Sequence, residues 1–105
     1  MIGTGIVYIP KIKKIYKKCK DEFSTREREY CFSKHNRYEH LAGRIAAKEA
    51  VKKAMRLKNI KFRNIEIDNV NQIPTVKIND KSCNVKLSIS HIKDYALAVV
   101  LKPWE

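Results

Sequence analysis

The sequence lacks the features that mark several protein classes. It has no apolar run near the 18 residues that a membrane span needs, and its opening segment, residues 1–10, is too short for the apolar region of a signal peptide. The three cysteines, Cys19, Cys31 and Cys83, are odd in number and without C-x-x-C spacing, which argues against a disulfide framework or a zinc site. These absences predict a protein of the reducing cytoplasm that does not span a membrane.

Positive charge is the main feature that is present. The 105 residues include 23 Lys and Arg against 11 Asp and Glu, for a net charge of +12. At 44% hydrophobic and 32% charged residues, the chain can bury a modest core, and its length suits a single domain over residues 1–105. The charge implies a polyanionic partner, such as nucleic acid, an acidic protein, an anionic membrane surface or a phosphorylated ligand.

Hydrophobic periodicity predicts one strand, then three helices, then four strands. These elements cover residues 1–9, 11–20, 24–32, 38–57, 65–70, 75–78, 85–90 and 95–101. Pro10 is expected to end the first strand, since proline has no backbone N–H to donate. The order indicates an α+β domain in which a mainly antiparallel sheet packs on the long central helix.

The long helix carries the first candidate site. Small and apolar side chains share one side and would allow a sheet or helix to approach closely, and Lys48, Glu49, Lys52 and Lys53 occupy the opposite arc. A single carboxylate among cations suits a phosphate-plus-metal site, in which Arg44 and the lysines hold phosphate oxygens and Glu49 holds a divalent ion. The alternative interpretation is a set of surface ion pairs, because such spacing occurs on many helices.

Two further segments have both a functional and an ordinary interpretation. His91 follows Ser88-Ile89-Ser90 at a strand end, where it could contact phosphate or move a proton, or simply be a solvated side chain. Six lysines in residues 11–20 could bind nucleic acid or the acidic helix of a protein, or form a solvated face. Nucleic acid is disfavoured, because no aromatic residues alternate with the lysines as a stacking surface would require.

Glycines near the N-terminus do not form a phosphate loop. Gly3-Thr4-Gly5 has neither the G-x-G-x-x-G nor the G-x-x-x-x-G-K-[ST] spacing, and it lies inside a strand-like run. These glycines are therefore interpreted as bulge or close-approach positions.

Four segments in chain order resemble motifs of the holo-acyl carrier protein synthase type of 4′-phosphopantetheinyl transferase. The strongest is HLAGRIAAKEA at residues 40–50, close to L-A-G-R-F-A-A-K-E-A. The others are residues 88–96, similar to S-I-S-H-T-K-x-Y-A, residues 23–31, similar to F-[ST]-x-x-E-x-x-Y-C, and residues 3–12, similar to G-[TI]-D-I-V-E-I-x-R-I. The resemblance extends over residues 1–100.

The resemblance implies transfer of phosphopantetheine from coenzyme A to a serine of an acyl carrier protein, with Mg²⁺. In that reaction the serine attacks the β-phosphate and the 3′,5′-nucleotide leaves. The implied assembly is a homotrimer with active sites between protomers. The implied catalytic residues are Lys53, His91 and Glu49, and Glu49 is also the implied metal ligand. The implied coenzyme A residues are Arg44, Lys48, Lys53, Ser90 and His91. The implied face for the acidic carrier protein is Lys11, Lys14 and Lys18.

The chain departs from the family at three places. Gly5 stands where the family has a metal-binding Asp, Tyr8 stands where it has Glu, and the G-T-G after the long helix is absent. The alternative function is therefore a catalytically altered homologue that binds carrier proteins or coenzyme A thioesters without metal-dependent transfer.

Overall fold

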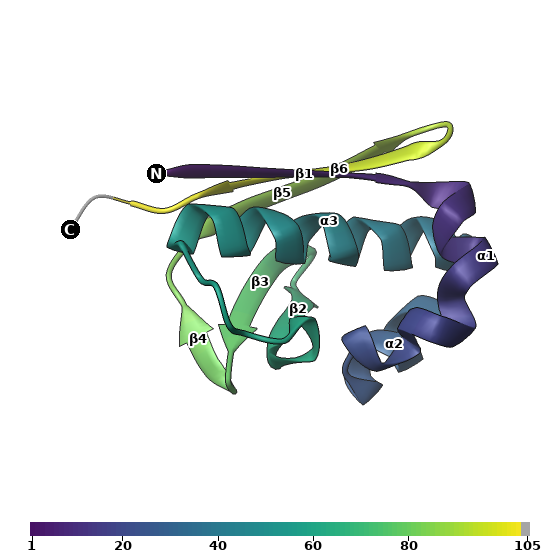
Figure 1. The fold of residues 1–105 in the computed structure, drawn as a ribbon, viewed down its shortest axis with the longest axis horizontal. Coiled ribbons are helices and arrows are strands. Elements are labelled where there is room, and N and C mark those ends of the chain that lie inside the picture. Colours follow the sequence, from purple (N-terminus) through teal and green to yellow (C-terminus); the bar gives the residue numbers. More distant parts are fainter. Residues whose placement is uncertain (104–105) are drawn as a thin grey trace.

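Two small antiparallel sheets and two shorter helices surround one long helix in the computed structural model, which describes residues 1–103 (Figure 1). The elements, with η for a 3-10 helix, are β1 (Ile2–Tyr8), α1 (Ile9–Cys19), η1 (Lys20–Glu22), α2 (Thr25–Phe32), α3 (Arg37–Met55), η2 (Phe62–Asn64), β2 (Ile65–Val70), β3 (Ile73–Ile78), β4 (Lys81–Cys83), β5 (Lys86–Ile92) and β6 (Tyr95–Leu101). None of the helices in this part of the chain is long and apolar enough to cross a bilayer.

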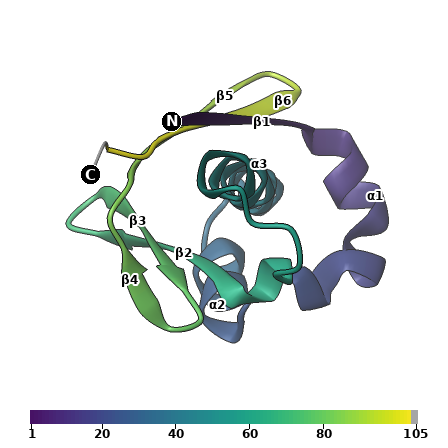
Figure 2. The ribbon, with the colours of Figure 1, turned by 60° about the vertical axis from the view of Figure 1, so that its left-hand side comes forward.

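The long helix α3 is the centre of the fold. One sheet has the strand order β1-β6-β5 and the other has the order β2-β3-β4, and all their pairings are antiparallel. Figure 2 views α3 nearly end-on, with β1, β5 and β6 above it, the other sheet to its lower left and α1 to its right. Because every layer packs on it, α3 is almost wholly buried between Leu41 and Val51.

The first sheet sits unusually close to α3. A Cβ atom added at Gly3 would lie 2.0 Å from the carbonyl oxygen of Ala50, and one added at Gly5 would lie 2.0 Å from that of Ala46. Gly3 and Gly5 pair with Val100 and Ala98 of β6, so the close contact lies on edge strand β1, beside the central strand of the sheet. The structure confirms these glycines as close-approach positions, matched by small side chains on the helix.

Most predicted elements are confirmed, with corrections at their ends. The first strand ends at Tyr8 and the helix begins at Ile9, because Pro10 occupies the first helical turn, where its missing N–H is not needed. The strands form two sheets rather than one. Strand β4, only three residues long, was not predicted, since Lys81-Ser82-Cys83 has no alternating pattern.

The outer face of the first sheet exposes large apolar side chains. They lie on all three strands, alternate with buried residues along β1 and β6, and are 41% to 68% exposed. The set is Ile2, Ile6 and Tyr8 on β1, Ile92 on β5, and Tyr95, Val99 and Leu101 on β6. A continuous apolar face of this kind marks an interaction surface.

The close approach of β1 to α3 predicts a steep cost for any side chain at Gly5. In Gly5→Ala, the added methyl group overlaps the carbonyl of Ala46, so the sheet must move away from the helix. We expect the free energy of unfolding, measured in urea, to fall by about 1–3 kcal/mol or more. Thr4→Ala, at the neighbouring exposed position, is the control and should change it by about 0.5 kcal/mol or less. Equal losses in the two variants would contradict the close packing.

Candidate functional site

The predicted site residues lie on two different sides of α3. Arg44 and Glu49 are five positions apart, which separates them by about 140° around a helix. Arg44 lines a cavity of about 230 Å³, and Glu49 lines an open pocket of about 520 Å³. We call these the arginine cavity and the glutamate pocket. The pocket is lined by Glu49, Lys52, Lys53, Arg56, Leu57, Lys58 and Phe62.

The glutamate pocket combines one carboxylate with several cations. Burial raises the pKa of Glu49, while the positive charges of Lys53 and, less strongly, Lys11 lower it. Lys53 does not form an ion pair with Glu49. Its ammonium donates a hydrogen bond to the carbonyl oxygen of Thr4 at 3.0 Å, so it bridges α3 to β1. The arrangement leaves Glu49 in a positive field, as a site for phosphate oxygens requires.

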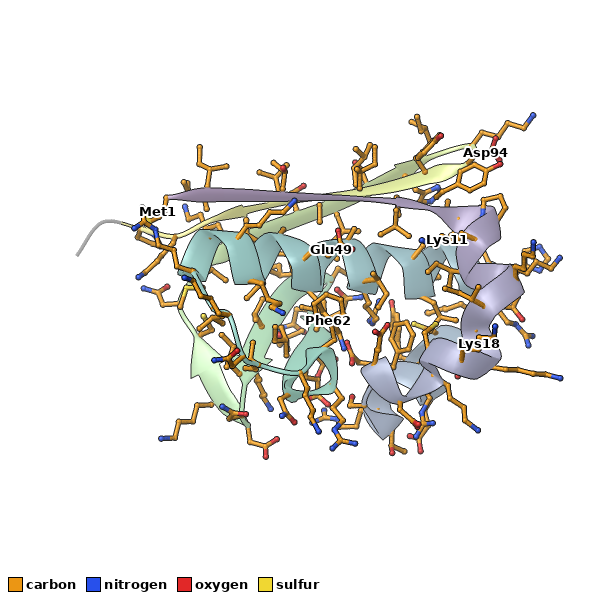
Figure 3. All side chains as sticks on the ribbon, viewed as in Figure 1. Met1, Lys11, Lys18, Glu49, Phe62 and Asp94 are labelled. Atoms are coloured by element: carbon orange, nitrogen blue, oxygen red, sulfur yellow. The ribbon has the colours of Figure 1, made fainter. Side chains whose placement is uncertain are left out.

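The opposite wall of the glutamate pocket comes from η2. The ring of Phe62 lies under the ammonium of Lys52 at 5.2 Å, a cation–π contact that orders both side chains. Figure 3 shows Glu49 at the middle of α3, with Phe62 below it and Lys11 at the start of α1. The pocket therefore lies between the last turns of α3 and the segment that follows it.

The arginine cavity contains a buried cation without an acidic partner. Arg44 is only 3% exposed, its guanidinium stacks on the ring of Tyr30 at 4.4 Å, and its Nε atom has no hydrogen-bond partner among residues 1–103. None of the ion pairs within that range involves Arg44. A buried charge normally has a partner, because leaving water is costly. An anion in the cavity would supply that partner.

Two more predicted residues, Ser90 and His91, join Arg44 in this cavity. They come from β5, and Asn69, Gln72 and Pro74 of the β2–β3 hairpin form the far wall. His91 Nε2 lies 3.4 Å from a carboxylate oxygen of Glu39, which is an ion pair when His91 is protonated. The structure therefore brings Arg44, Ser90 and His91 together, apart from Glu49 and Lys53.

A second histidine, His40, also lines the arginine cavity, and its environment disfavours a positive charge. Burial lowers the pKa of His40, and so do the charges of Arg44, Lys34 and His91, whereas Glu39 raises it. The neutral form that results leaves Arg44 as the principal cation of the cavity wall.

The structure contradicts the expected position of Lys48. Its side chain is completely buried rather than on the exposed arc of α3. The Nζ atom donates to the carbonyl oxygens of Glu22 at 2.6 Å and Phe62 at 2.9 Å, and to Oε1 of Glu27 at 2.7 Å. Burial lowers the pKa of Lys48, opposed by the carboxylate of Glu27. An ammonium has three donors, so Lys48 has none left for a coenzyme A phosphate.

Glu27 is the residue that the sequence reasoning did not recognise. Its Oε1 also accepts from the backbone N–H of Ser24 at 2.9 Å, and its Oε2 accepts from that of Ile67 at 3.1 Å. Ser24 and Glu27 form a capping box at the start of α2. The S-x-x-E pattern predicts the cap, but no local pattern predicts a lysine partner 21 residues away.

The lysines of α1 form an exposed cationic face beside the glutamate pocket. Lys11, Lys14 and Lys18 are exposed, while Ile12 and Cys19 turn inward to the core. Figure 3 labels Lys11 and Lys18 near the two ends of this face. Lys11 lies close enough to Glu49 to lower the pKa of that carboxyl group, so the Lys11 end of the face lies near the pocket.

The donor set suits a divalent ion only with help from a ligand. No group of three or more His, Cys, Asp or Glu side chains in residues 1–103 could hold a metal ion. An acid at Gly5 has no room beside Ala46. Mg²⁺ is commonly bound by one or two carboxylates together with substrate phosphates and water. Glu49 therefore fits as a single protein ligand to an ion that also binds phosphate.

Comparisons with known proteins find the chain similar to one family, to curated relatives and to solved structures. The model of the 4′-phosphopantetheinyl transferase superfamily matches residues 1–100. The holo-[acyl-carrier-protein] synthase of Thermodesulfovibrio yellowstonii is 42% identical over 95% of both chains. The structure of the Helicobacter pylori holo-[acyl-carrier-protein] synthase in complex with coenzyme A has a TM-score of 0.81 at 29% identity, covering 96% of this chain and 98% of that one. The structure of the Bacillus anthracis holo-(acyl-carrier-protein) synthase in complex with coenzyme A has a TM-score of 0.80 at 33% identity, covering 95% of this chain and 92% of that one.

The buried Lys48–Glu27 pair predicts a characteristic double-variant result. Lys48→Met leaves the carboxylate of Glu27 buried without its partner, so we expect the free energy of unfolding to fall by about 3–5 kcal/mol. Adding Glu27→Gln removes the uncompensated charge, so the double variant should be more stable than Lys48→Met alone. Lys52→Met, at a lysine of the same helix outside any ion pair, should cost about 1 kcal/mol or less. Urea unfolding of the original chain, of Lys48→Met and Glu27→Gln alone and of the double variant measures the coupling, and additive losses would contradict it.

Proposed function

Because this chain belongs to the 4′-phosphopantetheinyl transferase superfamily, as a holo-[acyl-carrier-protein] synthase, we propose that its two pockets are the halves of one coenzyme A site. The enzyme transfers phosphopantetheine from coenzyme A to an acyl carrier protein, and the resemblance found in the sequence is confirmed at the level of the family. The proposal assigns the phosphomonoester of coenzyme A to the arginine cavity and its diphosphate to the glutamate pocket.

The buried, unpartnered guanidinium of Arg44 is the observation that carries this assignment. A phosphomonoester in the cavity would supply the missing countercharge, with Ser90 and His91 as further hydrogen-bond donors. His91 already contacts the carboxylate of Glu39. A phosphate bound in the cavity would therefore either replace Glu39 as the partner of His91 or share the histidine with it. Lys48 is left out of the ligand set and acts as a buried support.

In the glutamate pocket, the chain's own residues hold the diphosphate in position for attack by the serine of the carrier protein. Lys53 neutralises phosphate oxygens, and Glu49 supplies the carboxylate ligand for Mg²⁺. When bound, the ion would offset the charge that develops on the transferring phosphoryl group. The bond from the carrier serine oxygen to the β-phosphorus forms as the bond to the bridging oxygen breaks. The serine proton passes to water, and adenosine 3′,5′-bisphosphate leaves with the bridging oxygen.

The two pockets face different directions on α3, so one protomer does not enclose both ends of a single ligand. We propose that neighbouring copies supply the two halves, in a homotrimer formed through the exposed apolar face of the first sheet. The support is the amount of apolar surface left open there, with Ile2 at 68% and Ile92 at 63% exposure. A closed ring of three heterologous contacts would cover this face in every copy.

The carrier protein is proposed to dock on the lysine face of α1. Lys11, Lys14 and Lys18 are exposed there, and Lys11 lies close enough to Glu49 to lower the pKa of that carboxyl group. An acidic helix of the partner would meet complementary charge beside the reacting phosphate, which speeds association and orients the serine.

A cytoplasmic location completes the proposal. The described cysteines are free thiols, and burial raises the pKa of Cys31 to about 11, which keeps it in the thiol form. Three free thiols suit a reducing compartment, where coenzyme A and apo-carrier proteins would meet the enzyme.

Mixing two inactive variants tests the shared site. Glu49→Gln and Arg44→Gln should each abolish the mass increase of an apo-carrier protein incubated with coenzyme A and Mg²⁺, measured by mass spectrometry. When the two variants are unfolded, mixed equally and refolded together, random trimers should regain activity at about a quarter of the sites. In those sites, one copy supplies an intact Glu49 and its neighbour an intact Arg44.

The control is each variant refolded alone, which should stay inactive. If the mixture also stays inactive while each variant folds as a trimer, the halves belong to a single protomer. If Glu49→Gln is as active as the original chain, the proposed catalytic pocket is wrong.

Charge reversal at Lys14 tests the docking face. In Lys14→Glu, repulsion between like charges should raise the KM for the carrier protein by about 10-fold, with little change in the KM for coenzyme A. Lys81→Glu makes the same change in net charge at the start of β4, outside both pockets, and should leave both constants nearly unchanged. Equal effects of the two reversals would show that overall charge, rather than this face, attracts the partner.

A further inference from the structure

Arg56, directly after the last turn of α3, has an unusual backbone conformation. Its φ of 55° and ψ of 41° are left-handed, and its N–H donates to the carbonyl oxygens of Lys52 and Lys53, which ends the helix. Glycine is the residue that adopts this conformation without strain. An arginine at this position therefore retains some backbone strain, which directs attention to its side chain.

The side chain of Arg56 lines the glutamate pocket and is exposed. No acidic side chain in residues 1–103 forms an ion pair with it. Its planar guanidinium can donate two parallel hydrogen bonds to the oxygens of a phosphate group, a geometry that lysine lacks. It is the one guanidinium among the side chains that line this pocket.

The charges around the pocket favour an anion even without a metal ion. Four cations, Lys52, Lys53, Arg56 and Lys58, face a single carboxylate, Glu49. The C-terminus of a helix adds only about half a negative charge. The diphosphate of coenzyme A carries about two negative charges near neutral pH, so the protein's cations alone can balance it.

We propose that Arg56 is a further diphosphate-binding residue, and that with the neighbouring lysines it binds the coenzyme A diphosphate before any divalent ion is present. The inference rests on the proposed function, which puts the diphosphate in this pocket. It gives Mg²⁺ a role in the transfer step rather than in holding the substrate. It also explains how a site with Glu49 as its single pocket carboxylate retains its ligand.

Isothermal titration calorimetry of coenzyme A in the presence of EDTA tests this inference. The original chain should bind without metal, and Arg56→Gly should bind about 10-fold more weakly or worse, the usual effect of losing a charge-assisted hydrogen bond. Glycine suits the left-handed backbone, so the Tm of this variant should hold or rise. The weakening should therefore not come from unfolding. Lys81→Gln removes a positive charge far from both pockets and is the control.

The variant Glu49→Gln should change the affinity for coenzyme A in the opposite direction to Arg56→Gly. Without a metal ion, its carboxylate repels the diphosphate, so the variant should bind coenzyme A several-fold more tightly in EDTA and yet lose activity with Mg²⁺. Dephospho-coenzyme A, which keeps the diphosphate but lacks the 3′-phosphate, should remain sensitive to Arg56→Gly and become insensitive to Arg44→Gln.

The outcomes separate this inference from the proposed function. If coenzyme A binds the original chain only with Mg²⁺, or if Arg56→Gly binds it unchanged in EDTA, the role of Arg56 is refuted while the pocket assignment stands. If neither Lys53→Ala nor Glu49→Gln alters binding under any condition, the diphosphate lies elsewhere and the proposed function itself fails at this pocket.

Discussion

The ion pair between Lys48 and Glu27 is the interaction on which the rest of the structure depends. It joins α3 to the cap of α2, and through the same two side chains to the carbonyls of Glu22 and Phe62 and the N–H of Ile67. Segments that are far apart in sequence are thus fixed to the residue directly before Glu49. Phe62, the outer wall of the glutamate pocket, is positioned by its own carbonyl bond to this lysine. The buried charge therefore builds the site without touching a substrate.

Local patterns predict much of this fold, because periodicity reports which side of an element is buried. The long helix, the short helix over residues 24–32 and the antiparallel strands other than β4 are found in this way. The spacing of Arg44, Lys48, Glu49 and Lys53 also points to α3, which lines both pockets. It does not tell which of these charged side chains the rest of the fold buries, because the buried Lys48 carries the same charge as the exposed Lys53. Lys48 was assigned to the wrong side for this reason, and its partner lies 21 residues away, beyond any local pattern.

The division of the site into two pockets has a similar cause. Arg44 and Glu49 are five positions apart on the helix. Their angular separation can be read from the sequence, whereas the walls that complete each pocket cannot. Those walls come from the β2–β3 hairpin in one case and from η2 in the other. The backbone strain at Arg56 also cannot be predicted from the sequence, since arginine is a common residue near the end of a helix. Only the left-handed backbone shows that the position would suit glycine better.

The opposite directions of the two pockets have a consequence for regulation. If neighbouring copies supply the two halves of the site, as proposed, a single copy of the chain would be folded and yet inactive. The active fraction of the protein would then be set by the equilibrium between single and assembled copies, and therefore by the concentration of the protein in the cell. Dilution would switch off such an enzyme without unfolding any of it, and a modest rise in expression would switch it on more steeply than in proportion.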